Sequence, residues 1–246
     1  MKITVLTQFP EMFGPVLSAS MLGRASDKEL LETQIVNIRD YSVDKHRKTD
    51  DTPFGGGFGM VMTPQPAFDA LKALNASGKR ILYMSPRGRK LDKDLALELS
   101  KEQELFILCG HYEGIDQRII DAWNMEEVSI GDYVLTGGEL PAMVLIDCVA
   151  RLIPGCLSDD EAALEESIYS GLLEADQYTK PREYEGYSVP DVLYNGNHKL
   201  IHLWQYEKSL RLTKSRRPDL FEAYLKKDKV LTKDEKKILD TVFLEY

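Results

Sequence analysis

Residues 129–141, which read SIGDYVLTGGELP, are the part of the chain best suited by residue type and spacing to hold a ligand. A short apolar run opens directly into a loop that contains Gly131, Gly137 and Gly138. Glycine adopts backbone angles that other residues avoid, and it lets main-chain N–H and C=O groups approach a ligand closely. The stretch matches neither G-x-G-x-x-G nor G-x-x-x-x-G-K-[ST], so it favours a flat, partly polar ligand over a phosphate group. An ordinary turn before a helix is the alternative.

Two other segments lead into loops of the same kind. Residues 80–84 and 105–109 are apolar runs typical of strands buried in a parallel sheet, and residues 127–130 form a third strand. Each of these runs is followed by a loop that contains glycine. In open α/β sheets ligands bind beyond the carboxyl ends of the strands, so the three loops predict one pocket.

The elements that must position these loops follow an α/β pattern. Residues 2–7 and 33–38 are rich in β-forming side chains, and the helical segments between them indicate a βαβ unit. Thr63 and Asp92 are suitable residues to cap helices. Helices are predicted over residues 11–17, 20–31, 64–74 and 92–100, in a stretch ending at 123, and from 141 toward 151.

The chain changes character after residue 157. Residues 158–170 are a polar, helix-prone connector, and the pattern beyond them is helical over residues 200–212. Pro218 suits the start of another helix, and Thr232 with Glu235 forms the S/T-x-x-E signature of a last one. We therefore expect a parallel-sheet domain over 1–157, a linker over 158–170 and a small, mainly helical domain over 171–246.

Residues 39–60 form a long loop that mixes charge, aromatic residues and glycine. Long loops without secondary structure are uncommon in compact domains unless they act as lids or binding loops. Phe54 and Phe58 suggest a segment that covers a bound substrate. The alternative is a surface excursion.

The charge distribution is uneven. The net charge of −9 over 246 residues argues against nucleic acid as a partner, because phosphate binding needs basic side chains. Residues 199–237, however, contain 12 basic and 6 acidic residues, a local charge of +6. This segment is a candidate nucleic-acid surface, with an ordinary solvated face as the alternative.

Other features restrict the class of protein. No run of 18 apolar residues occurs and the first residues do not form a signal peptide, so we expect a cytoplasmic protein without a membrane partner. Cys109, Cys148 and Cys156 sit among apolar neighbours without a C-x-x-C pair, which favours buried thiols. His198 and His202 are four residues apart, but no further suitably spaced ligands accompany them, and no metal site is predicted.

Several long motifs together resemble the bacterial tRNA (guanine-N1)-methyltransferases, which are trefoil-knotted enzymes of the SPOUT class that use S-adenosylmethionine. The similarity begins in YMSPRG at 83–88, CGHYEGID at 109–116 and the stretch 129–141. It extends to residues 50–51, 55–60, 151–155, 171–174, 178–181, 189–193 and 216–220, and so covers nearly the whole chain.

The resemblance implies a deep trefoil knot in the domain 1–157 and a homodimer with active sites built across the two chains. Periodicity alone does not suggest a knot, because knots are nearly absent from ordinary folds. A helix that carries Met143, Val144, Ile146 and Val149 suits such a dimer interface, although side chains of this kind more often belong to the core of their own chain.

The resemblance also implies ligands and their contacts. The family uses S-adenosylmethionine as methyl donor and is associated with Mg²⁺. The positions that match the family's cofactor contacts are Met84, Ser85, Pro86, Gly110, Glu113, Ser129, Ile130, Gly131, Asp132, Tyr133, Val134, Leu135, Gly137, Gly138 and Pro141. The motifs and the basic segment together predict tRNA contacts at Asp50, Gly59, Ser167, Lys208, Arg211 and Lys214.

The implied reaction is methylation of N1 of the guanine at position 37 of tRNA, next to the anticodon. Guanine N1 carries a proton at neutral pH, so the reaction needs a base to remove it and a cation to stabilise the charge that spreads onto O6. The family places the base at Glu166 and the cation at Arg151. The usual residue at the base position is Asp, which is one methylene shorter than Glu, and a solvated helix residue is the alternative for Glu166.

Two other functions compete with this one. A knotted RNA methyltransferase that modifies ribose is the nearest catalytic alternative, but the basic C-terminal segment and the whole-chain match favour base methylation. A noncatalytic RNA-binding module is the alternative from another class. It would leave the three glycine loops without a role.

Overall fold

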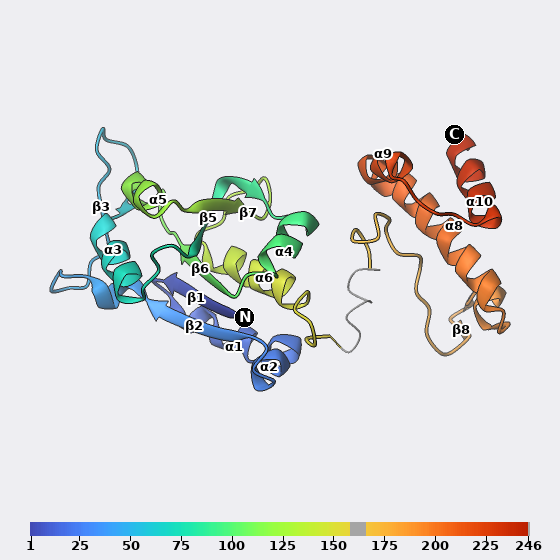
Figure 1. The fold of residues 1–246 in the computed structure, drawn as a ribbon, viewed down its shortest axis with the longest axis horizontal. Coiled ribbons are helices and arrows are strands. Elements are labelled where there is room, and N and C mark those ends of the chain that lie inside the picture. Colours follow the sequence, from blue (N-terminus) through green and yellow to red (C-terminus); the bar gives the residue numbers. More distant parts are fainter. Residues whose placement is uncertain (158–165, 246) are drawn as a thin grey trace. The chain divides into compact units, whose positions relative to one another are not determined.

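The computed structural model describes residues 1–157 and 166–245. The chain forms two compact units, Met1–Asp160 and Glu161–Tyr246, each with a hydrophobic core of its own (Figure 1). The predicted linker 158–170 includes residues 158–165, which lie outside the described residues. The limits of the linker and of the two domains therefore stay predictions.

A five-stranded parallel sheet forms the centre of the first unit (Figure 1). The strands lie in the order β2-β1-β6-β5-β7, so neighbours in the sheet are not always neighbours in the chain. They are β1 (Lys2–Thr7), β2 (Glu32–Asn37), β5 (Arg80–Lys90), β6 (Glu104–Cys109) and β7 (Glu126–Ser129). The predicted α/β class and parallel sheet are confirmed, whereas the knot stays a prediction.

Helices bury both faces of this sheet. Side chains alternate along each strand, so Leu105 and Ile107 of β6 belong to one core and Phe106 and Leu108 belong to the other. Helices α2 (Ser20–Asp27), α4 (Lys93–Leu99) and α6 (Glu139–Ala150) contribute to the first core, and α3 (Pro64–Ala73) and α5 (Gln117–Trp123) to the second. Burial on both faces explains why β6 is continuously apolar from Leu105 to Cys109.

Strand β5 continues beyond the point where the sequence predicts its end. Residues 85–88 were expected to form a loop after Met84, but the strand runs on to Lys90. Met84 and Arg89 both pair with Val128 of β7, so the residues between them form an irregularity inside the strand. A Cβ atom on Gly88 would lie 2.2 Å from the carbonyl carbon of Glu127, which shows how closely this bulge follows β7.

The loop 39–60 has more structure than predicted. A 3₁₀ turn, η2 (Ile38–Tyr41), stands at its start, and β3 (Asp50–Asp51) pairs antiparallel with β4 (Val61–Met62). The short elements η1 (Pro10–Met12) and α1 (Gly14–Leu17) follow β1. Phe54 and Phe58 are fully exposed, so neither packs on the first unit.

The second unit is mainly helical. Helices α8 (His198–Arg216), α9 (Pro218–Lys226) and α10 (Lys233–Leu244) pack around Leu210, Phe221 and Val242. The hairpin β8 (Glu183–Tyr184) and β9 (Tyr187–Ser188) and the turn η3 (Asp191–Tyr194) precede them. Pro218 begins α9 as predicted, and Thr232 and Glu235 form the predicted capping box of α10.

Acid should weaken the second unit through Glu235. Its carboxylate accepts hydrogen bonds from His202 Nε2 (2.8 Å) and from Thr232 N and Oγ1 (both 2.7 Å). These bonds, with the His202 bond first, lower the pKa of Glu235 from 4.5 to about 2. Because the pKa is lower in the folded state, its stabilisation is complete above about pH 4.5 and is lost as the pH falls toward 2.

This dependence can be measured in the fluorescence of Trp204. The chain has two tryptophans, so Trp123→Phe leaves a signal from the second unit alone. Glu235→Gln should lower the urea midpoint at neutral pH and reduce its fall between about pH 5 and pH 3. Asp240→Asn, which changes an exposed carboxylate of the same helix, is the control. If the urea midpoint falls equally with pH in wild type and in Glu235→Gln, the role of Glu235 is contradicted.

Candidate active site

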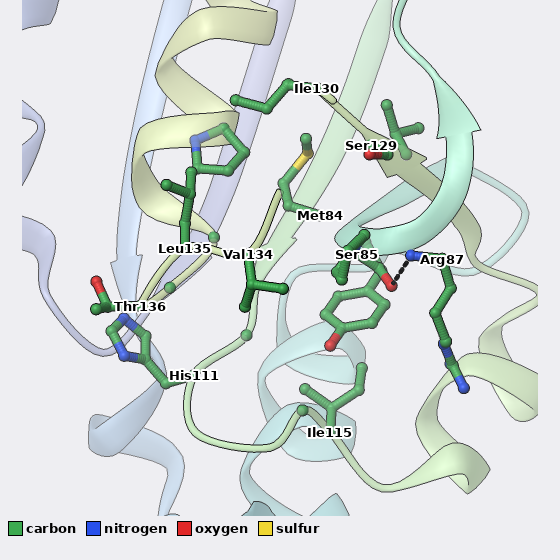
Figure 2. A pocket seen from close by; sticks show the side chains of 18 of the residues that line it. Met84, Ser85, Arg87, His111, Ile115, Ser129, Ile130, Val134, Leu135 and Thr136 are labelled. Atoms are coloured by element: carbon green, nitrogen blue, oxygen red, sulfur yellow. Dashed lines mark hydrogen bonds between the residues drawn. The ribbon is translucent and has the colours of Figure 1, made fainter. Parts of the chain in front are cut away.

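A cavity of about 300 Å³ lies at the carboxyl ends of β6 and β7 and beside the bulge of β5 (Figure 2). Three segments of the chain line it: the bulge of β5, the loop that follows β6, and the loop between β7 and α6. The prediction that these segments meet in one pocket is correct. The volume falls at the lower end of the range for small-molecule sites.

The structure brings together all the predicted cofactor residues except Asp132. The Asp132 side chain is 86% exposed and forms an ion pair with Lys90 (2.8 Å). Figure 2 shows Met84, Val134 and Leu135 among the side chains that line the cavity. The binding roles of these residues stay predictions, because no ligand is present.

The sequence did not identify several residues that also line the cavity. They are Tyr83, Arg87, His111, Tyr112, Gly114, Ile115, Gln117, Val128 and Thr136. Tyr83 and Val128 belong to the strands themselves, and alternation along β5 and β7 could have indicated them. Burial, and then the nearby Glu127 carboxylate, raises the pKa of Tyr83, so its hydroxyl stays protonated.

Charged side chains of both signs stand at the cavity. The Arg87 guanidinium donates through Nη2 to both carboxylate oxygens of Glu127 (3.1 Å each), and its main-chain N–H donates to Ser85 Oγ (3.3 Å; Figure 2). The exposed Glu113 adds a carboxylate next to Gly59. The site therefore combines apolar walls with one partly neutralised cation and one exposed anion.

Of the two properties predicted for the glycines of the third loop, backbone freedom is not used, because Gly131, Gly137 and Gly138 have no positive φ angle. Instead, other atoms lie close to the position that a side chain would take. A Cβ atom would lie 2.2 Å from His111 Nε2 at Gly137, 2.8 Å from Cys109 Cα at Gly138 and 2.3 Å from Tyr133 Cε1 at Gly131.

The two predicted catalytic residues lie in different units. Arg151 is the half-buried C-cap residue of α6. Glu166 is partly buried at the start of the described part of the second unit, and its carbonyl accepts a hydrogen bond from Ser170 N (3.1 Å). Residues 158–165 between them lie outside the described residues, so the pairing of Arg151 with Glu166 stays a prediction.

The predicted tRNA contacts are placed as follows in the first unit and at the start of the second. Asp50 pairs with Met62 in the β3–β4 ladder. Gly59 lies against the Glu113 side chain, where a Cβ atom would be 2.5 Å from Glu113 Oε1. The Ser167 hydroxyl accepts a hydrogen bond from Glu174 N (2.9 Å).

The basic residues selected on α8 also make contacts within their own unit. Lys208 Nζ lies 5.7 Å from the centre of the Trp204 ring. Arg211 donates to Glu207 (2.8 Å) and pairs with Glu245, and Lys214 Nζ donates to the Val242 carbonyl (2.7 Å). Arg211 and Lys214 thus fasten α8 to the end of α10, in addition to any contact with RNA.

The predicted dimer helix is mostly part of the core. Met143, Ile146 and Val149 of α6 are buried, which favours the alternative that these side chains pack within their own chain. Val144 is 43% exposed and Leu140, one turn earlier, is also exposed. Only these two side chains could extend an apolar face of α6 to a partner.

The described residues contain no group of three or more His, Cys, Asp and Glu side chains that could hold a metal ion. His202 is instead bonded to Glu235. All three cysteines are free thiols; Cys109 and Cys156 are buried as predicted, whereas Cys148 is only half-buried. Over the ranges that the structure covers, no helix is long and apolar enough to cross a membrane.

Comparisons with known proteins identify the chain's relatives. Residues 1–223 match a family model described as tRNA (Guanine-1)-methyltransferase TrmD. A tRNA (guanine-N(1)-)-methyltransferase of Alkaliphilus oremlandii is 53% identical over 250 residues, 98% of each chain. The enzyme of that name from Ruminiclostridium cellulolyticum is 56% identical over 90% of this chain and 96% of its own. The one from Staphylococcus carnosus is 49% identical over 98% and 96%.

Proposed function

Because this chain belongs to the tRNA (guanine-N1)-methyltransferase family, we propose that it methylates N1 of guanine 37 of tRNA with S-adenosylmethionine as donor. The single observation that supports this most strongly is the match of both units to enzymes of one activity. The pocket at the ends of β6 and β7 and beside the bulge of β5 supplies the matching site.

The pocket residues fit S-adenosylmethionine in character. The apolar side chains of Ile115, Val134 and Leu135 offer walls for a flat ring, and the close-packed third loop brings main-chain groups to the cavity. Glu113 provides negative charge for a cationic ligand. The bound donor supplies a methyl group on a sulfonium centre, and the chain's own residues orient it and exclude water.

In this proposal, Glu166 is the general base and Arg151 stabilises the negative charge that develops on the guanine. The Glu166 carboxylate accepts the proton from guanine N1, which leaves the ring nitrogen's electron pair free to take the methyl group as the donor's S–CH₃ bond breaks and its electron pair stays on sulfur. Negative charge that spreads onto O6 is stabilised by the Arg151 guanidinium.

Mg²⁺ belongs to the proposal only as an ion that the substrates help to bind. Mg²⁺ is commonly held by one or two carboxylates together with substrate oxygens, and does not need a cage of protein ligands. The described residues contain no group of three or more potential ligands. We assign the ion no step of the reaction.

The experiment that tests the function is methylation of bulk tRNA with labelled S-adenosylmethionine, followed by mapping of the modified nucleotide. The label should appear on N1 of guanosine 37. Label on a ribose would favour the knotted ribose methyltransferase instead. A thermal shift with S-adenosylmethionine separates the third candidate, because a noncatalytic RNA-binding module should not be stabilised by the donor.

We also propose that the enzyme acts in the cytoplasm as a homodimer with Arg151 and Glu166 contributed by different chains. Coexpressed Arg151→Ala and Glu166→Gln subunits should then recover about a quarter of wild-type activity, since half of the dimers are mixed and each has one intact site. Each variant expressed alone serves as the control. No recovery in isolated mixed dimers would place both residues in the same chain.

The basic segment 199–237, with its local charge of +6, should position tRNA by binding its phosphate groups. Lys236 and Lys237 of α10 are exposed, so Lys236→Gln/Lys237→Gln should weaken tRNA binding and flatten its dependence on salt, while affinity for S-adenosylmethionine is retained. Lys214→Gln is a less direct probe, because it also removes the bond to the Val242 carbonyl. An unchanged salt slope in the double variant would argue that α10 does not face tRNA.

A further inference from the structure

A carboxylate is buried beside the pocket at the start of α6. Glu139 is 1% exposed, and its Oε1 accepts a hydrogen bond from Thr7 Oγ1 (2.6 Å). Its Oε2 lies 2.7 Å from Nε2 of His111. This separation is within hydrogen-bonding distance. Glu139 therefore joins the end of β1 and the loop after β6 to the first turn of α6.

The main chain shows that the same two loops touch at this point. Gly138 N donates to the Gly110 carbonyl (2.9 Å), and His111 forms an isolated antiparallel bridge with Gly137. A Cβ atom on Gly137 would lie 2.2 Å from His111 Nε2 and 2.5 Å from Glu139 Oε2. The absence of a side chain at Gly137 is what lets the imidazole reach the carboxylate.

His111 also faces the ligand cavity. Its ring packs against Phe9, with ring centres 4.6 Å apart, and Figure 2 shows it beside Thr136 of the third loop. A buried hydrogen bond of this kind adds only modest net stability, because it replaces hydrogen bonds that both side chains make to water in the unfolded chain. A pair placed between two pocket loops can, however, fix their relative position.

We propose that Glu139 and His111 form a latch that holds the loop 110–116 against the loop 131–138 in the arrangement that binds S-adenosylmethionine. His111 is thus a positioning residue. Only the identity of the ligand, S-adenosylmethionine, rests on the proposed function. The geometry that defines it is present without ligand, which allows a test in the protein alone.

Two substitutions of His111 separate the hydrogen bond from the ring. His111→Phe keeps an aromatic ring for Phe9 but cannot donate to Glu139, and should raise the dissociation constant for S-adenosylmethionine about 10- to 100-fold. His111→Gln places an amide N–H close to the position of Nε2 and should restore most of the affinity. Saturating S-adenosylmethionine should return the single-turnover rate of His111→Phe toward that of wild type, since chemistry is unaffected.

A double variant tests whether the pair is only structural. His111→Phe leaves the buried Glu139 side chain without one of its two partners. Glu139→Gln/His111→Phe replaces the carboxylate by a neutral amide that still accepts the hydrogen bond from Thr7 Oγ1, and should fold. The latch predicts that this double variant melts near the wild-type temperature but still binds S-adenosylmethionine weakly. Recovery of both stability and affinity in the double variant would overturn the proposal.

Hydrogen exchange supplies a readout without ligand. The Gly138 amide, which donates to Gly110, should exchange faster in the folded double variant than in wild type. The matched control is His202→Phe, which breaks a His–Glu pair in the other unit and should alter neither this exchange nor the affinity. If wild type does not bind S-adenosylmethionine, the proposed function fails; if Gly138 exchange is unchanged in the double variant, the latch fails.

Discussion

Glu166→Gln should lower the single-turnover rate of methyl transfer by about 10²- to 10⁴-fold, while tRNA and S-adenosylmethionine still bind. The amide keeps the size and hydrogen bonding of the side chain but is a far poorer proton acceptor. Guanine N1 must lose its proton before or during attack, so the loss falls on the chemical step. The measurement is a single-turnover assay with labelled S-adenosylmethionine and enzyme in excess over tRNA.

Two companion variants make the result specific. Glu165→Gln changes the neighbouring carboxylate, which lies outside the described residues, and should have little effect. A fast Glu166→Gln enzyme beside an inactive Glu165→Gln enzyme would move the base one residue back. Near-normal rates in both would place the base elsewhere in the chain.

Glu166→Asp tests whether the length of the side chain matters. The Glu166 carbonyl accepts a hydrogen bond from Ser170 N, and the Ser167 hydroxyl accepts one from Glu174 N. These two local hydrogen bonds restrain the main chain around residue 166. If these bonds fix the backbone in the complex, Asp should be slower than Glu here, because its carboxylate reaches one methylene less far. Equal rates would indicate that the segment adjusts to the substrate.

The strands of the first unit could be predicted because their signal is strong and local. β1 occupies the predicted residues 2–7, and β6 begins one residue before the predicted start. The order of the strands was not predicted. β1 lies between β2 and β6, although β6 begins nearly a hundred residues later. The pairing of β1 with β6 depends on how the crossover helices pack on the two faces of the sheet.

The bulge of β5 shows where local reasoning fails. Serine, proline and glycine are residues of turns, so residues 85–88 read as a loop. They lie instead inside β5, between Met84 and Arg89, which both pair with Val128, and Gly88 lies directly against the backbone of Glu127 and Val128. That contact depends on a strand about forty residues away and is invisible in the local pattern.

The candidate site was predictable in outline but not in its supporting contacts. The motif residues Ser85, Gly110 and Gly131 do line one cavity. The bond between His111 and Glu139 joins residues 28 apart in the chain, and no spacing rule indicates it. Backbone freedom was one of two roles predicted for the glycines, whereas the structure shows close packing, against main-chain atoms at Gly138 and against the Tyr133 ring at Gly131.

Gly138→Ala should raise the dissociation constant for S-adenosylmethionine about 10- to 100-fold, and Gly131→Ala should change it less than about threefold. At Gly138 the new methyl group would lie 2.8 Å from Cys109 Cα and 3.0 Å from Gly110 N. Both are main-chain atoms at the end of β6, so relief requires the two pocket loops to separate. Overpacking of this kind typically costs about 1–3 kcal/mol.

At Gly131 the nearest obstacle is the ring of Tyr133, whose side chain is 55% exposed and can rotate away. Both alanine variants therefore add a methyl group to the same loop. In Gly138→Ala it meets fixed main-chain atoms, and in Gly131→Ala it meets a side chain that can move. Calorimetric titration with S-adenosylmethionine, together with melting temperatures, measures the difference. Equal losses of affinity would contradict the distinction between a fixed neighbour at Gly138 and a movable neighbour at Gly131.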